Sequence, residues 1–264
     1  MMILEPIQLT GEYDPSTACR GMCPQCGREH ALPVGPAYGP ALALFHRLEQ
    51  EGRLDFTAPK QEVDPRLSTE YLYGPARGQM FGVLVVRDQV GDTFVLKAFS
   101  GQYNSLWQVK GWVDPLLDVK RFRKDTFEEE IRIKLMGSEI AKLPSESSVR
   151  QRLVRERKKA SQVLMQKIHA MFRLPNFRDK CVSLPLAVFG KEGVPTGTGD
   201  CCAPKLLGCA AAHGLTPLGL AEFYFGRSNR SGTKHHGEFY PSCQHKCGRI
   251  LGYMLCGLEN KNDN

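Results

Sequence analysis

The stretch Gly199-Asp200-Cys201-Cys202-Ala203-Pro204-Lys205-Leu206-Leu207 places two adjacent thiols where a helix is expected to begin. A second stretch, Tyr240-Pro241-Ser242-Cys243-Gln244-His245-Lys246-Cys247, places another two before the last expected helix. Thiolates are soft ligands that suit zinc, and two short clusters at two helix ends can hold one ion between them. We therefore expect a zinc site in the C-terminal third, with ligands from Cys201 or Cys202 and from Cys243 and Cys247.

The composition is that of a globular chain with an excess of positive charge. Its 264 residues, 42% of them hydrophobic, are enough to bury a core, and this excludes a disordered protein. The 35 Lys and Arg exceed the 28 Asp and Glu by seven, so an anionic partner is allowed and nucleic acid is the first candidate.

The N-terminal and cysteine patterns indicate a cytoplasmic protein that does not enter a membrane. Residues 1–6 show no signal-peptide pattern, and no apolar run approaches the length of a membrane span. Ten cysteines in a reducing compartment favour metal binding or catalysis over disulfides.

Residues 1–40 form a segment rich in Gly, Pro and Cys. Within it, Cys19, Cys23, Cys26 and His30 are close enough in sequence to close a tetrahedral zinc knuckle. The cysteine spacing also resembles that of radical S-adenosylmethionine enzymes, a resemblance that implies an iron–sulfur cluster. Residues 40–140 lack the strand–helix alternation of the barrel in those enzymes. We rank a structural zinc first, unbound cysteines second and an iron–sulfur enzyme third.

Residues 41–264 are expected to form one α/β (α+β) domain with a basic helical insertion over residues 116–175. Helical periodicity predicts helices over residues 40–51, 203–213 and 243–258, and runs of β-branched and aromatic residues predict strands over 80–87, 93–99 and 218–225.

The second half of the insertion, residues 148–172, combines an apolar stripe with a crowd of cations. The residues that we expect to contact RNA are Arg150, Arg152, Arg155, Arg157, Lys158 and Lys159. Such a helix binds phosphate without reading the base sequence, and a merely solvated helix face is the alternative.

The order hairpin, helix, strand, helix, with thiols at both helix starts, resembles the cytidine deaminase fold. The resemblance implies a three-layer core, a mixed sheet flanked by helices, in which zinc activates a water against a cytosine or adenine ring. It makes Cys201 or Cys202 the first ligand and Cys243 and Cys247 the pair, although three residues separate that pair instead of two.

The catalytic Glu of deaminases has no counterpart after the first thiol. Ala203 and Pro204 stand at the positions where it is expected. Glu222 and Glu238 are the remaining acidic candidates for proton transfer.

Several motifs also resemble the N-terminal extension of long bacterial RluA-type RNA pseudouridine synthases. They are Gly78-Gln79-Met80-Phe81-Gly82-Val83-Leu84-Val85, Ala98-Phe99-Ser100-Gly101, residues 198–207, residues 220–226 and residues 236–251. The resemblance implies an RNA-modification context, with tRNA or rRNA and an RNA-modification enzyme as partners. The synthase activity itself is not expected, because the only approximation to the catalytic His-Arg-Leu-Asp is Gly52-Arg53-Leu54-Asp55, upstream of the resembling region.

Two hypotheses follow. In the first, the chain is a zinc-binding, RNA-associated protein with a deaminase-like site; in the second, it is a non-catalytic RNA-binding or adaptor module with a structural zinc. The coordination of the metal separates them, because a structural site is closed by four protein ligands whereas a catalytic site keeps a position for water.

Overall fold

A four-stranded sheet lies at the centre of the protein, whose computed structural model describes residues 4–9, 13–59 and 62–259. Its strand order is β1 (Glu5–Pro6), β5 (Thr93–Phe99), β4 (Gln79–Arg87) and β8 (Thr216–Phe225). The predicted hairpin and the later strand are confirmed as β4, β5 and β8. Every pairing is antiparallel, which differs from the mixed sheet that the deaminase resemblance implied. The difference comes from β8, which pairs with the edge of β4 that β5 leaves free. Because β8 runs in the direction opposite to β4, the described part of the sheet contains no parallel pair of strands.

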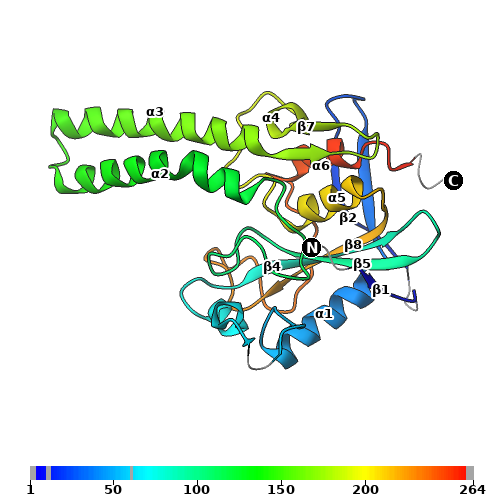
Figure 1. Cartoon of the computed structure of the whole chain (residues 1–264). Coiled ribbons are helices and arrows are strands. Elements are labelled where there is room, and N and C mark those ends of the chain that lie inside the picture. Colours follow the sequence, from blue (N-terminus) through cyan, green and yellow to red (C-terminus); the bar gives the residue numbers. More distant parts are fainter. Residues whose placement is uncertain (1–3, 10–12, 60–61, 260–264) are drawn as a thin grey trace.

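Helices cover both faces of this sheet, as predicted (Figure 1). One face carries α1 (Tyr38–Glu51), and the other carries α5 (Cys202–Ala212), beside which α6 (Gly248–Leu255) lies. Alternate residues of β4 supply the two cores: Phe81, Val83 and Val85 pack with α1, whereas Leu84 and Val86 pack with α5. A strand buried on both faces explains the continuous apolar run in its sequence.

The N-terminal segment is a hairpin, β2 (Asp14–Met22) and β3 (Glu29–Gly35), that packs against β8 and α6. Its contact with α6 depends on glycine, because a Cβ at Gly252 would lie 2.3 Å from the carbonyl oxygen of Gly21. Ala18 and Leu32 join the same hydrophobic core as α5 and α6. Residues 13–35 are therefore tied to the body by close backbone packing as well as by side chains.

The predicted helical insertion is a hairpin of two long helices, α2 (Val119–Lys142) and α3 (Ser148–Met171). Side-chain caps begin both helices: the Asp118 carboxylate accepts from two backbone N–H groups of α2, and the Ser147 hydroxyl accepts from one of α3. Lys167 joins them through an ion pair with Glu129 at 2.8 Å. The hairpin projects from the body as an arm (Figure 1).

Short elements complete the chain: 3-10 turns at Pro65–Leu67 and Thr69–Tyr73, strands β6 (Arg173–Pro175) and β7 (Cys181–Ser183), and helix α4 (Leu184–Ala187). None of the described helices is both long enough and apolar enough to cross a membrane.

Candidate metal centre

The turn between β2 and β3 brings the N-terminal ligands together. The Cys23 N–H donates to the Arg28 carbonyl at 2.9 Å, and the Gly27 N–H donates to the Cys23 carbonyl at 3.0 Å. Gly27 has a φ of 69°, a left-handed conformation that glycine adopts without strain. The closed turn presents Cys23 and Cys26 to one side, where His30 of β3 meets them.

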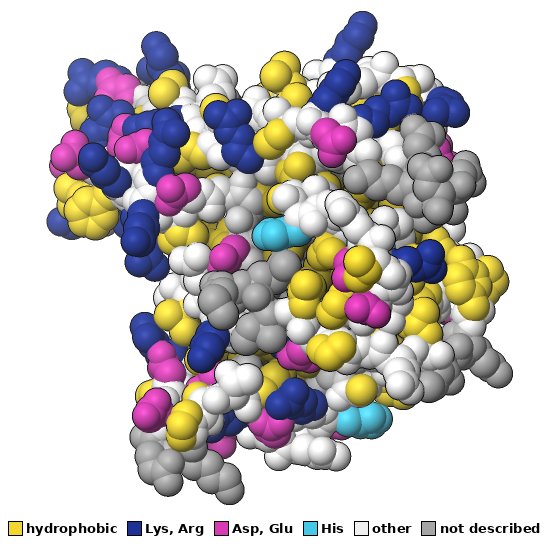
Figure 2. Space-filling view, turned by 45° about the vertical axis from the view of Figure 1, so that its right-hand side comes forward, with side chains coloured by type: hydrophobic (Ala, Val, Ile, Leu, Met, Phe, Trp, Pro, Cys, Tyr) yellow, Lys and Arg dark blue, Asp and Glu magenta, His cyan; other side chains and the backbone are white. Residues whose placement is uncertain are grey.

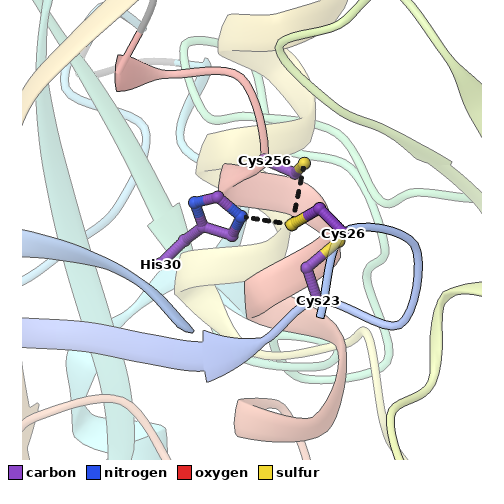
Figure 3. Close-up of side chains that lie close together, drawn as sticks. All are labelled: Cys23, Cys26, His30 and Cys256. Atoms are coloured by element: carbon purple, nitrogen blue, oxygen red, sulfur yellow. Dashed lines mark hydrogen bonds between the residues drawn. The ribbon is translucent and has the colours of Figure 1, made fainter. Parts of the chain in front are cut away.

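A fourth residue, Cys256, arrives from the chain immediately after α6. Figure 3 shows the four side chains converging on one point. The Cys26 Sγ lies 3.1 Å from the His30 Nε2 and 3.8 Å from the Cys256 Sγ, and all four candidate ligand atoms lie within 4.8 Å of one another. In a tetrahedral site with Zn–S bonds of about 2.3 Å, two sulfur ligands lie about 3.8 Å apart. The spacing therefore fits a Cys₃His metal site.

The second nitrogen of His30 has a carboxylate beside it. Glu259 Oε2 lies 3.4 Å from the His30 Nδ1, and Glu259 Oε1 lies 3.3 Å from Arg28 Nη2. A metal-binding histidine usually donates its other N–H to a carboxylate or carbonyl, which fixes the tautomer and orients the ring. Glu259 is placed for this role, and it leaves the Nε2 of His30 for the metal.

The cluster contains a thiol that ionises readily. Burial opposes ionisation of Cys26, but hydrogen bonds from the Arg28 backbone N–H, from His30 and from the Cys23 and Cys256 thiols outweigh it and lower its pKa to about 6. The Cys256 pKa is raised to about 12, mainly by burial and then by the Cys23 thiol. A thiolate is the form that binds a metal, so the low pKa of Cys26 favours metal binding by this thiol.

The N-terminal ligand set predicted from the sequence is corrected at one position. Cys19 is not in the cluster, and Cys256 stands in its place. Cys19 lies in β2, pairs in register with Leu32 and is fully buried in the core. Four residues of strand span about 13 Å, too far for Cys19 and Cys23 to share a metal. Sequence reasoning missed Cys256 because it lies 230 positions from Cys26 and follows a buried helix, so it looks like a core residue.

The four predicted C-terminal ligands are not brought together. Within residues 4–9, 13–59 and 62–259, only one group of three or more Cys, His, Asp or Glu side chains lies close enough together to bind a metal ion. That group is the cluster of Cys23, Cys26, His30 and Cys256. Cys201 interacts with the Cys247 thiol, which together with burial raises the Cys201 pKa strongly. Cys202 instead donates to the Met80 carbonyl at 3.4 Å, and Cys243 is exposed on a turn. Cys201 is the extended N-cap residue of α5 and contacts Cys247 before α6, whereas Cys202 is the first residue of the helix and contacts β4, so the two thiols do not meet at one point.

The two acidic candidates also lie away from the Cys/His cluster. Glu222 is buried beside α5, where its carboxylate accepts from the Ala203 backbone N–H at 3.0 Å and from the Ser242 hydroxyl at 2.9 Å. Burial raises its pKa in spite of these bonds. Glu238 accepts a 2.5 Å hydrogen bond from the Tyr240 hydroxyl. Both carboxylates therefore have structural partners, and neither faces a described group of metal ligands.

The six predicted RNA-contacting residues lie on α3. Arg150 is half-buried and the other five are exposed. Arg152 forms an ion pair with Glu156 at 3.8 Å, and the Arg157 guanidinium lies over Gly137 of α2. Figure 2 shows Lys and Arg gathered over the projecting part of the molecule.

No family model matches this chain, and neither a curated protein nor a solved structure matches it. The likeness to deaminases and to RluA-type extensions therefore stays a prediction.

Proposed function

We propose that this chain is a non-catalytic RNA-binding protein of the RNA-modification apparatus, in which a zinc ion has a structural role. The α2–α3 arm would contact the RNA, and the zinc would hold the N-terminal hairpin to the end of α6. The proposal rests on the distribution of charge and on the closed character of the candidate metal centre.

The separation of charge between arm and body is the observation that carries the proposal. Helices α2 and α3 together contain fourteen Lys and Arg but only six Asp and Glu, an excess of eight positive charges. The whole chain has an excess of seven, so the remainder has one negative charge more than it has positive charges. The positive excess of the protein therefore lies entirely on the arm, as expected of a surface that binds a polyanion.

The shape of the arm favours contact with the nucleic acid backbone. Each helix has 24 residues, which corresponds to a length of about 36 Å. Double-stranded RNA is recognised mostly by shape and by phosphate contacts across its grooves, and a long basic helical hairpin suits such contacts. The resemblance to RluA-type extensions supports tRNA or rRNA as the ligand and an RNA-modification enzyme as a partner.

The metal centre favours a structural role over a catalytic one. If all four side chains bind one zinc ion, three thiols and one imidazole would complete a tetrahedral shell and would leave no position for a reactive water. Since the thiols at α5 and α6 form no group of ligands, the deaminase-like alternative has no metal-activated water at the expected position. We expect no ammonia release from cytidine- or adenosine-containing RNA.

Fluorescence anisotropy with bulk tRNA and with an rRNA fragment, at increasing salt, tests the proposal. Replacing Arg152, Arg155, Lys158 and Lys159 with Ala is expected to weaken RNA binding at low salt. The plot of the log of the association constant against the log of the salt concentration should become less steep, its negative slope decreasing in magnitude by about three to four. The matched control replaces four exposed cations of the body, Arg87, Lys110, Lys191 and Lys246, and is expected to leave the slope unchanged. Equal effects of both variants would show that the arm has no special role.

A further inference from the structure

Helix α2 carries an apolar stripe on the side turned away from α3. Phe127, Ile131 and Leu135 are 63%, 41% and 60% exposed. They follow one another at intervals of four residues, so successive side chains turn by only about 40° and share one face. Glu129 and Gly137, which contact α3, lie on the other side of the helix. Three large apolar side chains in a row on an exposed helix are typical of an interaction surface.

We propose that this stripe binds the same stripe of a second copy of the chain, with the two α2 helices antiparallel and a two-fold axis at Ile131. In this arrangement Ile131 meets its own symmetry mate. Phe127 of each copy then lies opposite Leu135 of the other, because the two positions are equally far from Ile131 on either side. The stripe is thus complementary to itself, which is what a two-fold interface requires.

The charges that border the stripe favour the antiparallel arrangement. Glu128 of one copy lies across from Arg132 of the other, on the same side of the apolar seam, and Arg121 lies across from Glu139. The symmetry makes each of these opposite-charge pairs occur twice, in the way that flanking charges select partner and direction in coiled coils.

Two sets of like charges oppose the arrangement. Arg132 lies near its own symmetry mate beside the axis, where Glu128 of each partner borders it, and the second set lies at the helix ends. Lys120 of one copy lies opposite Lys142 of the other, at the two ends of the helices. The helix ends are the most solvated part of the seam, and long lysine side chains there can extend into water, where salt screens the repulsion. The two Glu128–Arg132 contacts lie near the centre, whereas the two Arg121–Glu139 contacts lie beside the Lys120–Lys142 contacts at the helix ends and offset them.

In this dimer the basic surface of α3 would remain exposed to solvent in both copies. Two arms joined along α2 present their α3 helices on opposite sides of the assembly. The interface uses none of the six cations of α3 that are proposed to contact RNA. Its existence can be tested without RNA.

Sedimentation equilibrium of the full chain measures the dissociation constant of the dimer. Ile131→Asp places two carboxylates at the two-fold axis and is expected to raise that constant at least about tenfold. Val154→Asp is the matched control, because Val154 lies on α3 and is 43% exposed, close to the 41% of Ile131. It is expected to leave the dissociation constant unchanged.

A charge exchange tests the direction of the two helices. Glu128→Arg alone places like charges together twice and is expected to raise the dissociation constant about tenfold. The double variant Glu128→Arg/Arg132→Glu restores the opposite-charge pairs and is expected to return the constant close to that of the wild type. A wild type that stays monomeric at its highest soluble concentration overturns the proposal. So does a dimer that ignores Ile131→Asp, or one that the charge exchange fails to restore.

Discussion

Removing the Cys256 thiol tests the metal-ligand assignment most directly. Cys256 ties the end of α6 to the β2–β3 turn, and it lies 230 positions along the chain from Cys26. In the chain-entropy model, a cross-link that closes a loop of this length stabilises the fold by about 5 kcal/mol. Cys256→Ala removes the cross-link even if the other three ligands still hold the ion.

Cys19→Ala is the matched control for this substitution. Cys19 and Cys256 are 0% and 1% exposed, so each change removes one buried sulfur atom. The loss of packing is expected to be about 1 kcal/mol for either thiol. The difference between the two variants therefore measures the effect of losing a metal ligand. It also distinguishes the candidate ligand set that the structure brings together, which contains Cys256, from the set that the sequence spacing predicted, which contained Cys19.

Zinc content by mass spectrometry and unfolding in urea provide the two readouts. Cys19→Ala is expected to keep one zinc per chain, whereas Cys256→Ala should lose zinc to a mild chelator and unfold with a free energy about 5 kcal/mol lower than that of Cys19→Ala. Stripping the metal from both variants should abolish the difference between them. The assignment is wrong if Cys19→Ala releases the zinc, or if the two zinc-loaded variants are equally stable.

Three further predictions address the surroundings of the metal and of the core. Glu259→Gln weakens the orientation of His30 and is expected to lower zinc affinity about tenfold to a hundredfold in a chelator competition. Burial raises the pKa of Glu222 in the folded state, so the wild type is expected to lose stability as pH rises above the ordinary pKa of a glutamate, measured by urea midpoints. Glu222→Gln should not lose stability over this range, and parallel curves for the two proteins would contradict the prediction. Gly252→Ala forces a Cβ into the backbone of β2 and is expected to destabilise the fold by at least about 2 kcal/mol, whereas Gly39→Ala, in open space, should not destabilise it.

Local patterns in the sequence were sufficient to predict most of the secondary structure. The β-branched runs of β4 and β5 and the stop of α1 at Gly52, which has a φ of 64°, correspond to the observed elements. The basic insertion was also predicted to be helical, because propensity and periodicity act within a few residues. The direction of β8 relative to β4 was not predictable in this way, since both parallel and antiparallel edges accept the same apolar strand.

The candidate metal centre likewise combines residues that are close in the sequence with one that only the packing of the chain brings near them. The sequence by itself determined that Cys23, Cys26 and His30 lie near one another, because a short turn keeps them within a few ångströms. Only the tertiary structure decided that Cys19 is buried in the core and that Cys256 is the fourth member of the candidate metal site. Because a strand rises by about 3.3 Å per residue, Cys19 lies far from Cys23 although the two are close in the sequence. The packing of α6 on β2, in contrast, brings Cys256 close to Cys26 although the two are far apart in the sequence. Spacing along the chain therefore predicts a metal site only as far as its ligands share one turn.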